Sequence, residues 1–122
     1  MPRTLRSLIA PALVAVLLCS RALAGDFQAV AATDKAWRPR GAHLTLAAAL
    51  QVAEASAATR GMNVAEFQPP WFRYDYDVYY PDMGLGDYAW AFVYEAKAPG
   101  SDSHFMVVVN DRTQYAQFIP GR

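Results

Sequence analysis

Two apolar stretches, Tyr88-Ala-Trp-Ala-Phe-Val-Tyr-Glu-Ala-Lys97 and His104-Phe-Met-Val-Val-Val-Asn110, decide the fold of this chain. Both are rich in aromatic and β-branched residues, and both carry apolar side chains on each of their alternating faces, as central β-strands do. The residues between them, Ala98-Pro-Gly-Ser-Asp-Ser103, are typical of a turn. Because a lone hairpin is only marginally stable in water, we expect the rest of the chain to add strands and a covering helix.

The neighbouring segments predict one more strand on each side of this hairpin. Residues 71–80 alternate with a period of two, which indicates a half-buried strand with an aromatic inner face. Its other face carries Trp71, Arg73, Asp75, Asp77 and Tyr79. Residues 81–87 read as an acidic loop, and residues 114–119 as a short last strand that Pro120 ends.

One amphipathic helix is predicted over residues 44–60. Thr45 is a suitable N-cap, and Gly61 is the residue expected just past the C-terminal end. Apolar residues recur at helical spacing and form a stripe, made of Leu46, Leu50, Ala53 and Ala57. We expect this stripe to pack on one face of the hairpin, made of Trp90, Phe92, Phe105, Val107 and Val109.

The order of these elements predicts an α+β fold. One N-terminal helix would pack on a four-stranded antiparallel meander sheet, because short connections favour antiparallel pairing of successive strands.

The first 24 residues have the pattern of a cleaved secretory signal peptide. Arg3 and Arg6 precede an apolar run over residues 8–18, and Ala22-Leu23-Ala24 is a suitable cleavage site. An uncleaved anchor is the alternative interpretation, although the apolar run is short for a membrane span. We therefore expect a periplasmic or secreted protein that begins at Gly25, with no stable membrane anchor after cleavage.

The expected mature chain has 98 residues, enough for one domain with a modest core. Residues 25–43 read as an N-terminal arm and residues 44–122 as a single domain. Eight basic and eleven acidic residues give the mature chain a net charge of −3. This charge argues against nucleic acid and against an anionic membrane surface as partners.

Cysteine and histidine usage restricts the possible chemistry. Cys19 is the single cysteine and lies in the signal peptide, so the mature chain is predicted to be free of disulfides and of thiolate sites. His43 and His104 are the two histidines, and neither lies in a G-x-S-x-G or H-E-x-x-H motif. We expect no catalytic residue and no cofactor, and hence no enzyme; a small hydrolase that uses His104 is the alternative.

Four acidic residues in and after the 71–80 strand could in principle bind calcium. They are Asp75, Asp77, Asp82 and Asp87. Counted from Asp75, position twelve of an EF-hand loop is Gly86 instead of glutamate, so the spacing does not fit. We expect a solvated acidic face and no metal site.

Aromatic residues are concentrated in one part of the chain, since 11 of the 16 lie between Phe67 and Tyr94. Tyrosine combines apolar area with a hydrogen-bonding tip, which suits both a small core and a protein interface. Both interpretations stay open for residues 71–80. If this stretch is an interface, the predicted partner-binding residues are Tyr79, Asp75, Asp77, Asp82 and Asp87. Their acidic character predicts an exported partner protein with a basic patch.

The helix followed by Tyr88-Ala-Trp-Ala-Phe-Val-Tyr and His104-Phe-Met-Val-Val-Val-Asn-Asp-Arg-Thr resembles the small exported PepSY-like domains. The resemblance covers roughly residues 44–119. The chain departs from that family at Gln114, where the family usually has glycine, and residues 74–87 have no counterpart in it. The resemblance implies an inhibitory or protein-binding module instead of an enzyme, and it transfers no catalytic residue. A looser similarity is to small exported immunity proteins that neutralise toxins.

Overall fold

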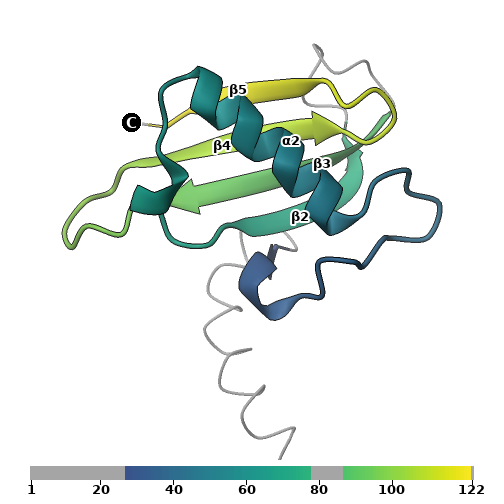
Figure 1. The fold of residues 1–122 in the computed structure, drawn as a ribbon, viewed down its shortest axis with the longest axis horizontal. Helices are drawn as coiled ribbons and strands as arrows, with labels where there is room; N and C mark the ends of the chain where they lie inside the picture. Colours follow the sequence, from purple (N-terminus) through teal and green to yellow (C-terminus); the bar gives the residue numbers. More distant parts are fainter. Residues whose placement is uncertain (1–26, 78–86, 122) are drawn as a thin grey trace, which may run out of the picture.

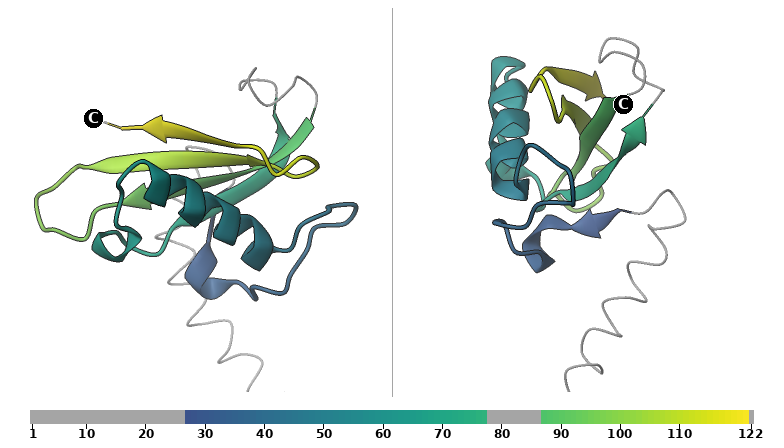
Figure 2. Two further views of the ribbon diagram at one scale, coloured as in Figure 1. Left: turned by 45° about the horizontal axis from the view of Figure 1, so that its top comes forward. Right: turned by 90° about the vertical axis from the view of Figure 1, so that its right-hand side faces the viewer.

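The computed structural model describes residues 27–77 and 87–121. Within these residues it has two layers, a five-stranded antiparallel sheet and one α-helix that lies across a single face of the sheet (Figures 1 and 2). The strands follow one another across the sheet in chain order. They are β1 (Gln28–Ala29), β2 (Trp71–Asp77), β3 (Asp87–Glu95), β4 (His104–Asn110) and β5 (Ala116–Pro120). The predicted α+β class with an antiparallel meander is confirmed.

The predicted strand number is wrong, because residues that read as an N-terminal arm add a fifth strand. In β1, Gln28 lies opposite Phe72 and Ala29 opposite Trp71. The backbone N–H of Val30 then donates to the Pro70 carbonyl at 3.0 Å, where the short 3₁₀ helix η1 (Val30–Ala32) begins. A two-residue strand carries no readable alternation, so only its pairing with β2 reveals it. The α-helix therefore lies mid-chain, after β1, and is not the first element.

The helix α2 (Leu46–Thr59) is fixed at both ends by the residues that the sequence pattern indicated. Thr45 is extended, and its hydroxyl accepts a hydrogen bond from the Ala48 N–H at 3.1 Å. At the C-terminal end, Gly61 has a φ of +78°, and the Met62 N–H donates to the Ala57 carbonyl at 3.0 Å. This is the Schellman arrangement, which satisfies carbonyls that would otherwise lack a partner.

The main core lies between α2 and the sheet, as the strand pattern predicted. Leu46, Ala49, Ala53 and Ala57 of the helix are fully buried against it. The facing residues of the sheet include Trp90, Phe92, Phe105, Val107 and Val109, all of which are buried. The small alanines let the helix lie close to large aromatic rings on the strands, so the bulk of the core comes from the sheet.

The last strand begins later than predicted, because Gln114 belongs to the turn before it. Its φ is +65°, in the left-handed region that an L-residue with a side chain rarely adopts. A residue with this backbone cannot continue a strand, so β5 begins at Ala116 and extends to Pro120. Within residues 27–77 and 87–121, no helix has both the length and the apolar character needed to cross a membrane.

Candidate functional site

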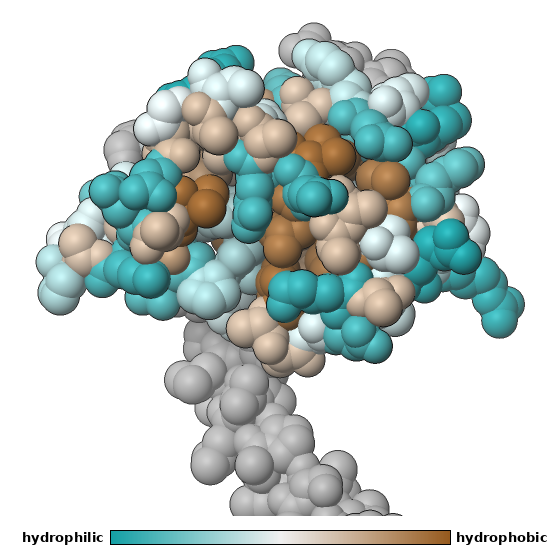
Figure 3. All heavy atoms as spheres, in the orientation of Figure 1, coloured by the Kyte–Doolittle hydropathy of each residue, from teal (hydrophilic) through white to brown (hydrophobic). Residues whose placement is uncertain are grey.

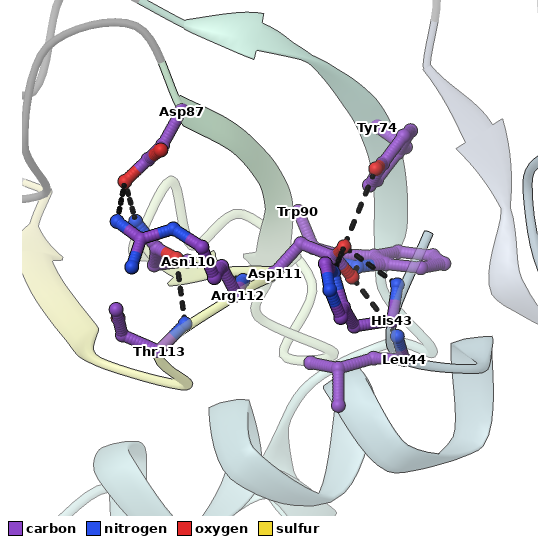
Figure 4. A network of polar contacts seen from close by, with 9 residues as sticks. All are labelled: His43, Leu44, Tyr74, Asp87, Trp90, Asn110, Asp111, Arg112 and Thr113. Atoms are coloured by element: carbon purple, nitrogen blue, oxygen red, sulfur yellow. Dashed lines mark hydrogen bonds and ion pairs between the residues drawn. The ribbon is translucent and has the colours of Figure 1, made fainter. Parts of the chain in front are cut away.

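A buried carboxylate, that of Asp111, lies just after the end of β4 and collects hydrogen bonds from three separate segments (Figure 4). The Leu44 N–H and the Trp90 indole N–H each donate to Oδ1 at 3.0 Å. The His43 N–H donates to Oδ2 at 2.7 Å, and the Tyr74 hydroxyl lies 3.4 Å from the same oxygen. We call these five residues the Asp111 network. It ties the start of the helix to β2 and β3.

The turn from Asn110 to Gln114 aims Asp111 into this position. The Asn110 side-chain oxygen accepts from the backbone N–H groups of Arg112 and Thr113, at 2.8 and 2.9 Å. Such an Asx turn reverses the chain directly after the strand. The Asp111 N–H donates to the Tyr88 carbonyl at 3.0 Å, which holds its backbone against β3.

The hydrogen bonds determine the charge state of this carboxylate. Burial alone would raise the pKa of Asp111, but donation from His43, Trp90 and Leu44 outweighs that effect and lowers it below the ordinary value. The opposite shift occurs at Tyr74, where burial and then the negative charge of Asp111 raise the pKa to about 12. Asp111 is therefore an ionised acceptor, and Tyr74 a neutral donor, at neutral pH.

The imidazole of His43 is the most exposed side chain of the network. Its Nδ1 lies 3.2 Å from Asp111 Oδ2, and its side chain is 65 % exposed. The histidine borders a small hollow that is lined also by Gly41, Tyr74, Asp87, Tyr88 and Arg112. A histidine held by a carboxylate can act as a general base, but acyl transfer also needs a nucleophile and an oxyanion hole. No serine, threonine or cysteine is among the described residues that line this hollow.

Three tyrosines lie next to this hollow, and we call Tyr74, Tyr76 and Tyr88 the tyrosine cluster. The Tyr88 ring stacks on Tyr74 with centroids 5.4 Å apart and meets Tyr76 edge-on at 5.3 Å. Tyr76 is 52 % exposed and Tyr88 is 50 % exposed. All three project from the helix-bearing face of the sheet. The Tyr74 hydroxyl also donates to the carboxylate of Asp111. Two half-exposed aromatic rings thus pack against each other, and one of them stacks on Tyr74, whose hydroxyl contacts the buried Asp111.

The partner-binding residues predicted from the sequence lie in several different environments. Asp75 is exposed, and its Oδ1 accepts from the Tyr76 N–H at 2.7 Å. Asp77 lies opposite Asp87 in the register of β2 and β3. Tyr79 and Asp82 lie outside the described residues. The structure therefore brings Asp77 and Asp87 to one end of the sheet and leaves the rest of the predicted surface a prediction.

Asp87 already has protein partners. Its Oδ2 accepts from Asn110 Nδ2 and from Arg112 Nη2, each at 2.8 Å. The bond from Asn110 and then that from Arg112 lower the pKa of Asp87. Its charge is thus balanced by Arg112, which weakens the case for Asp87 as a contact to a basic partner.

The two histidines differ in their hydrogen-bond partners. His104 is exposed, and its Nδ1 contacts the backbone oxygen of Asp102 at 2.9 Å. Only His43 has a carboxylate partner among the residues that the structure describes. Over the same residues, no three side chains of the histidine, cysteine, aspartate and glutamate types gather as they would around a metal ion.

Sequence reasoning missed Asp111 as the central residue of the site. Asn110-Asp111-Arg112-Thr113 reads correctly as a turn, but the pattern does not show that one of its polar residues points inward. A lone carboxylate directly after the most apolar strand was the available signal. Comparison of the chain with protein-family models, curated proteins and solved structures finds no match.

Proposed function

We propose that this chain is a non-enzymatic exported module that binds another protein, and that the tyrosine cluster forms the centre of the contact. The observation that carries the proposal is the half-exposure of Tyr76 and Tyr88 in mutual ring contact. Aromatic residues are enriched in protein interfaces, and tyrosine is common among the few residues that supply most of the binding energy.

The packing of Tyr74 behind the exposed rings favours this surface. Tyr74 stacks on Tyr88 and also contacts Trp90, with centroids 4.9 Å apart, and Trp90 is fully buried. A ring held in place before binding loses little conformational freedom when the partner arrives. The exposed rings of Tyr76 and Tyr88 therefore suit a contact that needs no rearrangement of the sheet.

The acidic residues of the other face would extend the contact. Asp75 belongs to the same strand end as Tyr76 and is exposed. With the net charge of −3 expected for the mature chain, this position favours a partner with a basic patch. Association should then slow as salt is added, because exposed charges are screened. An inhibitor or a toxin-neutralising immunity protein would both act through such a contact.

The test is affinity capture of exported proteins with three variants as bait, compared with the unchanged chain. Tyr76→Ser combined with Tyr88→Ser removes the exposed rings. Asp75→Asn combined with Asp77→Asn removes the two acidic groups of β2. Tyr115→Ser is the matched control, because Tyr115 is 49 % exposed and precedes β5, with β4 between it and the strands β2 and β3 of the cluster. Circular dichroism checks that each variant folds.

We expect the Tyr76/Tyr88 variant to lose the captured partner and the Tyr115 control to retain it. If only the Asp75/Asp77 variant loses the captured partner, the contact is made by these acidic residues and not by the tyrosine cluster. If all three variants capture the same proteins as the unchanged chain, neither surface binds and the proposal is wrong.

A small hydrolase is the second candidate, and the contact between His43 and Asp111 moves its centre from His104 to His43. Activity of the purified protein on ester and amide substrates that is lost on His43→Ala, and kept on His104→Ala, would support it. The half-exposed aromatic rings next to His43 fit a binding surface better than the concave pocket in which active sites usually lie.

A further inference from the structure

A second hollow lies on the helix-bearing face and shares no lining residue with the hollow at His43. It is a groove of about 360 Å³ between α2 and the segment that links the short 3₁₀ helix η2 (Val64–Glu66) to β2. Its walls are mainly apolar and include Val30, Leu50, Val64, Phe67, Pro69 and Pro70. Figure 3 shows hydrophobic atoms gathered at the centre of this face with hydrophilic side chains around them. Its volume falls at the lower end of the range for small-molecule sites.

Tyr94 lines this groove and has an unsatisfied hydroxyl. The residue is only 1 % exposed, and within the described residues its hydroxyl has no hydrogen-bond partner. Burial, and then the negative charge of Glu54, raises the pKa of Tyr94, so the hydroxyl keeps its proton. An unpaired buried hydroxyl is unfavourable, and such groups call for a partner. The hydroxyl oxygen is itself covered, so a ligand oxygen would supply the missing acceptor by displacing a side chain at the floor of the groove.

The charges at the groove are equally unusual. The chain has two lysines, Lys35 and Lys97, and both line it. They come from distant parts of the sequence, one after η1 and the other after β3. Neither forms an ion pair with a carboxylate in the part of the chain that the structure describes. Glu54 is the single acidic residue among the lining residues described, so positive charge is in excess.

We propose that this groove binds a small apolar carboxylic acid. The apolar body would lie against Leu50, Val64 and Phe67. A ligand oxygen would accept the Tyr94 hydrogen bond, and the two lysine ammonium groups would balance the carboxylate charge.

Other ligand classes fit the groove less well. An amine would pair with Glu54 but would face two lysines, so the net interaction is repulsive. A neutral alcohol could accept from Tyr94 but would leave the lysines without a counter-charge. The charges and the hydroxyl together therefore favour a carboxylate over both.

Three matched probes test the ligand class with the purified protein: 3-phenylpropanoate, 3-phenylpropanol and 3-phenylpropylamine. They share a ring and chain and differ only in the terminal group. We expect the carboxylate to bind about tenfold more tightly than the alcohol, because hydrogen bonds to charged groups are the stronger ones. The amine should bind most weakly. Chemical-shift titration measures all three affinities.

Variants then locate the binding. Tyr94→Phe should weaken both the carboxylate and the alcohol, whereas Lys35→Ala and Lys97→Ala should weaken the carboxylate alone. Glu54→Gln should strengthen carboxylate binding, since it removes a negative charge that repels the ligand carboxylate. Arg38→Ala is the matched control, because Arg38 is exposed and does not line the groove, and it should leave the affinities unchanged.

Stability gives an independent reading of the Tyr94 hydroxyl. Without ligand, Tyr94→Phe should raise the thermal midpoint by about 4 °C, because it removes an unpaired buried polar group. The proposal is overturned if none of the probes binds, or if the amine or the alcohol binds more tightly than the carboxylate. It is overturned equally if the Tyr94, Lys35 and Lys97 variants all bind the carboxylate like the unchanged protein.

Discussion

The indole N–H of Trp90 donates a 3.0 Å hydrogen bond to the carboxylate of Asp111, and both residues are buried. Trp90 lies in β3, the central strand of the sheet, and Asp111 follows β4. The same carboxylate accepts from the backbone of His43 and Leu44, just before the helix N-cap. One ionised group therefore fixes where the helix begins relative to the sheet, and it supports the tyrosine cluster beside it.

Replacing this carboxylate should destabilise the protein strongly. In Asp111→Asn, one accepting oxygen becomes an amide group. It then faces either the donors Leu44 and Trp90 or the donors His43 and Tyr74. We expect a loss of about 2–4 kcal/mol in the free energy of unfolding, as found when buried hydrogen-bond networks are broken. Urea denaturation at pH 7 measures it. Asp75→Asn, at an exposed position of β2, is the control and should change stability little. A comparable loss in both variants would contradict the role of Asp111.

The same carboxylate should make stability depend on acid. The folded state lowers the pKa of Asp111, whereas in the unfolded chain an aspartate titrates near 3.9. The stabilisation is then fully present above about pH 4 and is lost as the pH falls towards the lower folded-state value. Urea midpoints between pH 6 and pH 2 should fall more steeply for the unchanged protein than for Asp111→Asn. Parallel curves would show that other carboxylates govern acid unfolding.

The left-handed residue before β5 offers a stabilising substitution. Gln114 has a φ of +65°, which is unfavourable for a residue with a Cβ atom but free of strain for glycine. We expect Gln114→Gly to raise the free energy of unfolding by about 0.5–1 kcal/mol. Thr113→Gly, one residue earlier at a position without positive φ, is the control and should destabilise. A loss of stability in Gln114→Gly would mean that its side chain makes a contact worth more than the strain.

Truncation of a core side chain on the sheet face that packs on α2 should lower the free energy of unfolding. Phe92 is fully buried beneath the helix, with Trp90 and Phe72 beside it. Phe92→Ala should cost about 3–5 kcal/mol, because it leaves a cavity that the surrounding rings cannot fill. Tyr88→Ala, on the same face of β3 but half exposed, should cost far less. Chemical denaturation distinguishes the two, and a loss below about 1 kcal/mol for Phe92→Ala would contradict the packing.

Export is testable by mass. The pattern of residues 1–24 predicts that the protein isolated from its native compartment begins at Gly25. Intact mass spectrometry of that material should give a chain of 98 residues. A mass that still includes the first 24 residues would refute cleavage and would change the net charge on which the salt dependence rests.

Local pattern determined the elements of this fold. Alternation in β2, β3 and β4, the Thr45 cap and the Gly61 end all depend on residues within a few positions of one another, so the sequence indicates them directly. The same alternation explains only in part which aromatic residues of β2 are buried and which are exposed. Phe72 and Tyr76 share one face of β2, yet Phe72 is buried and Tyr76 is exposed. Residues outside the strand decide this. The Trp37 ring packs on Phe72 with centroids 5.9 Å apart, whereas Tyr76 contacts Tyr88, which is itself half exposed.

Only the tertiary structure decided which distant residues meet. His43 and Leu44 reach Asp111 across 68 and 67 positions of the chain, and β1 joins the sheet through two residues that carry no pattern of their own. The two lysines and the unpaired Tyr94 hydroxyl share a groove for the same reason. Periodicity reports the environment of one segment, whereas these contacts depend on the path of the whole chain, and both proposed binding surfaces arise from them.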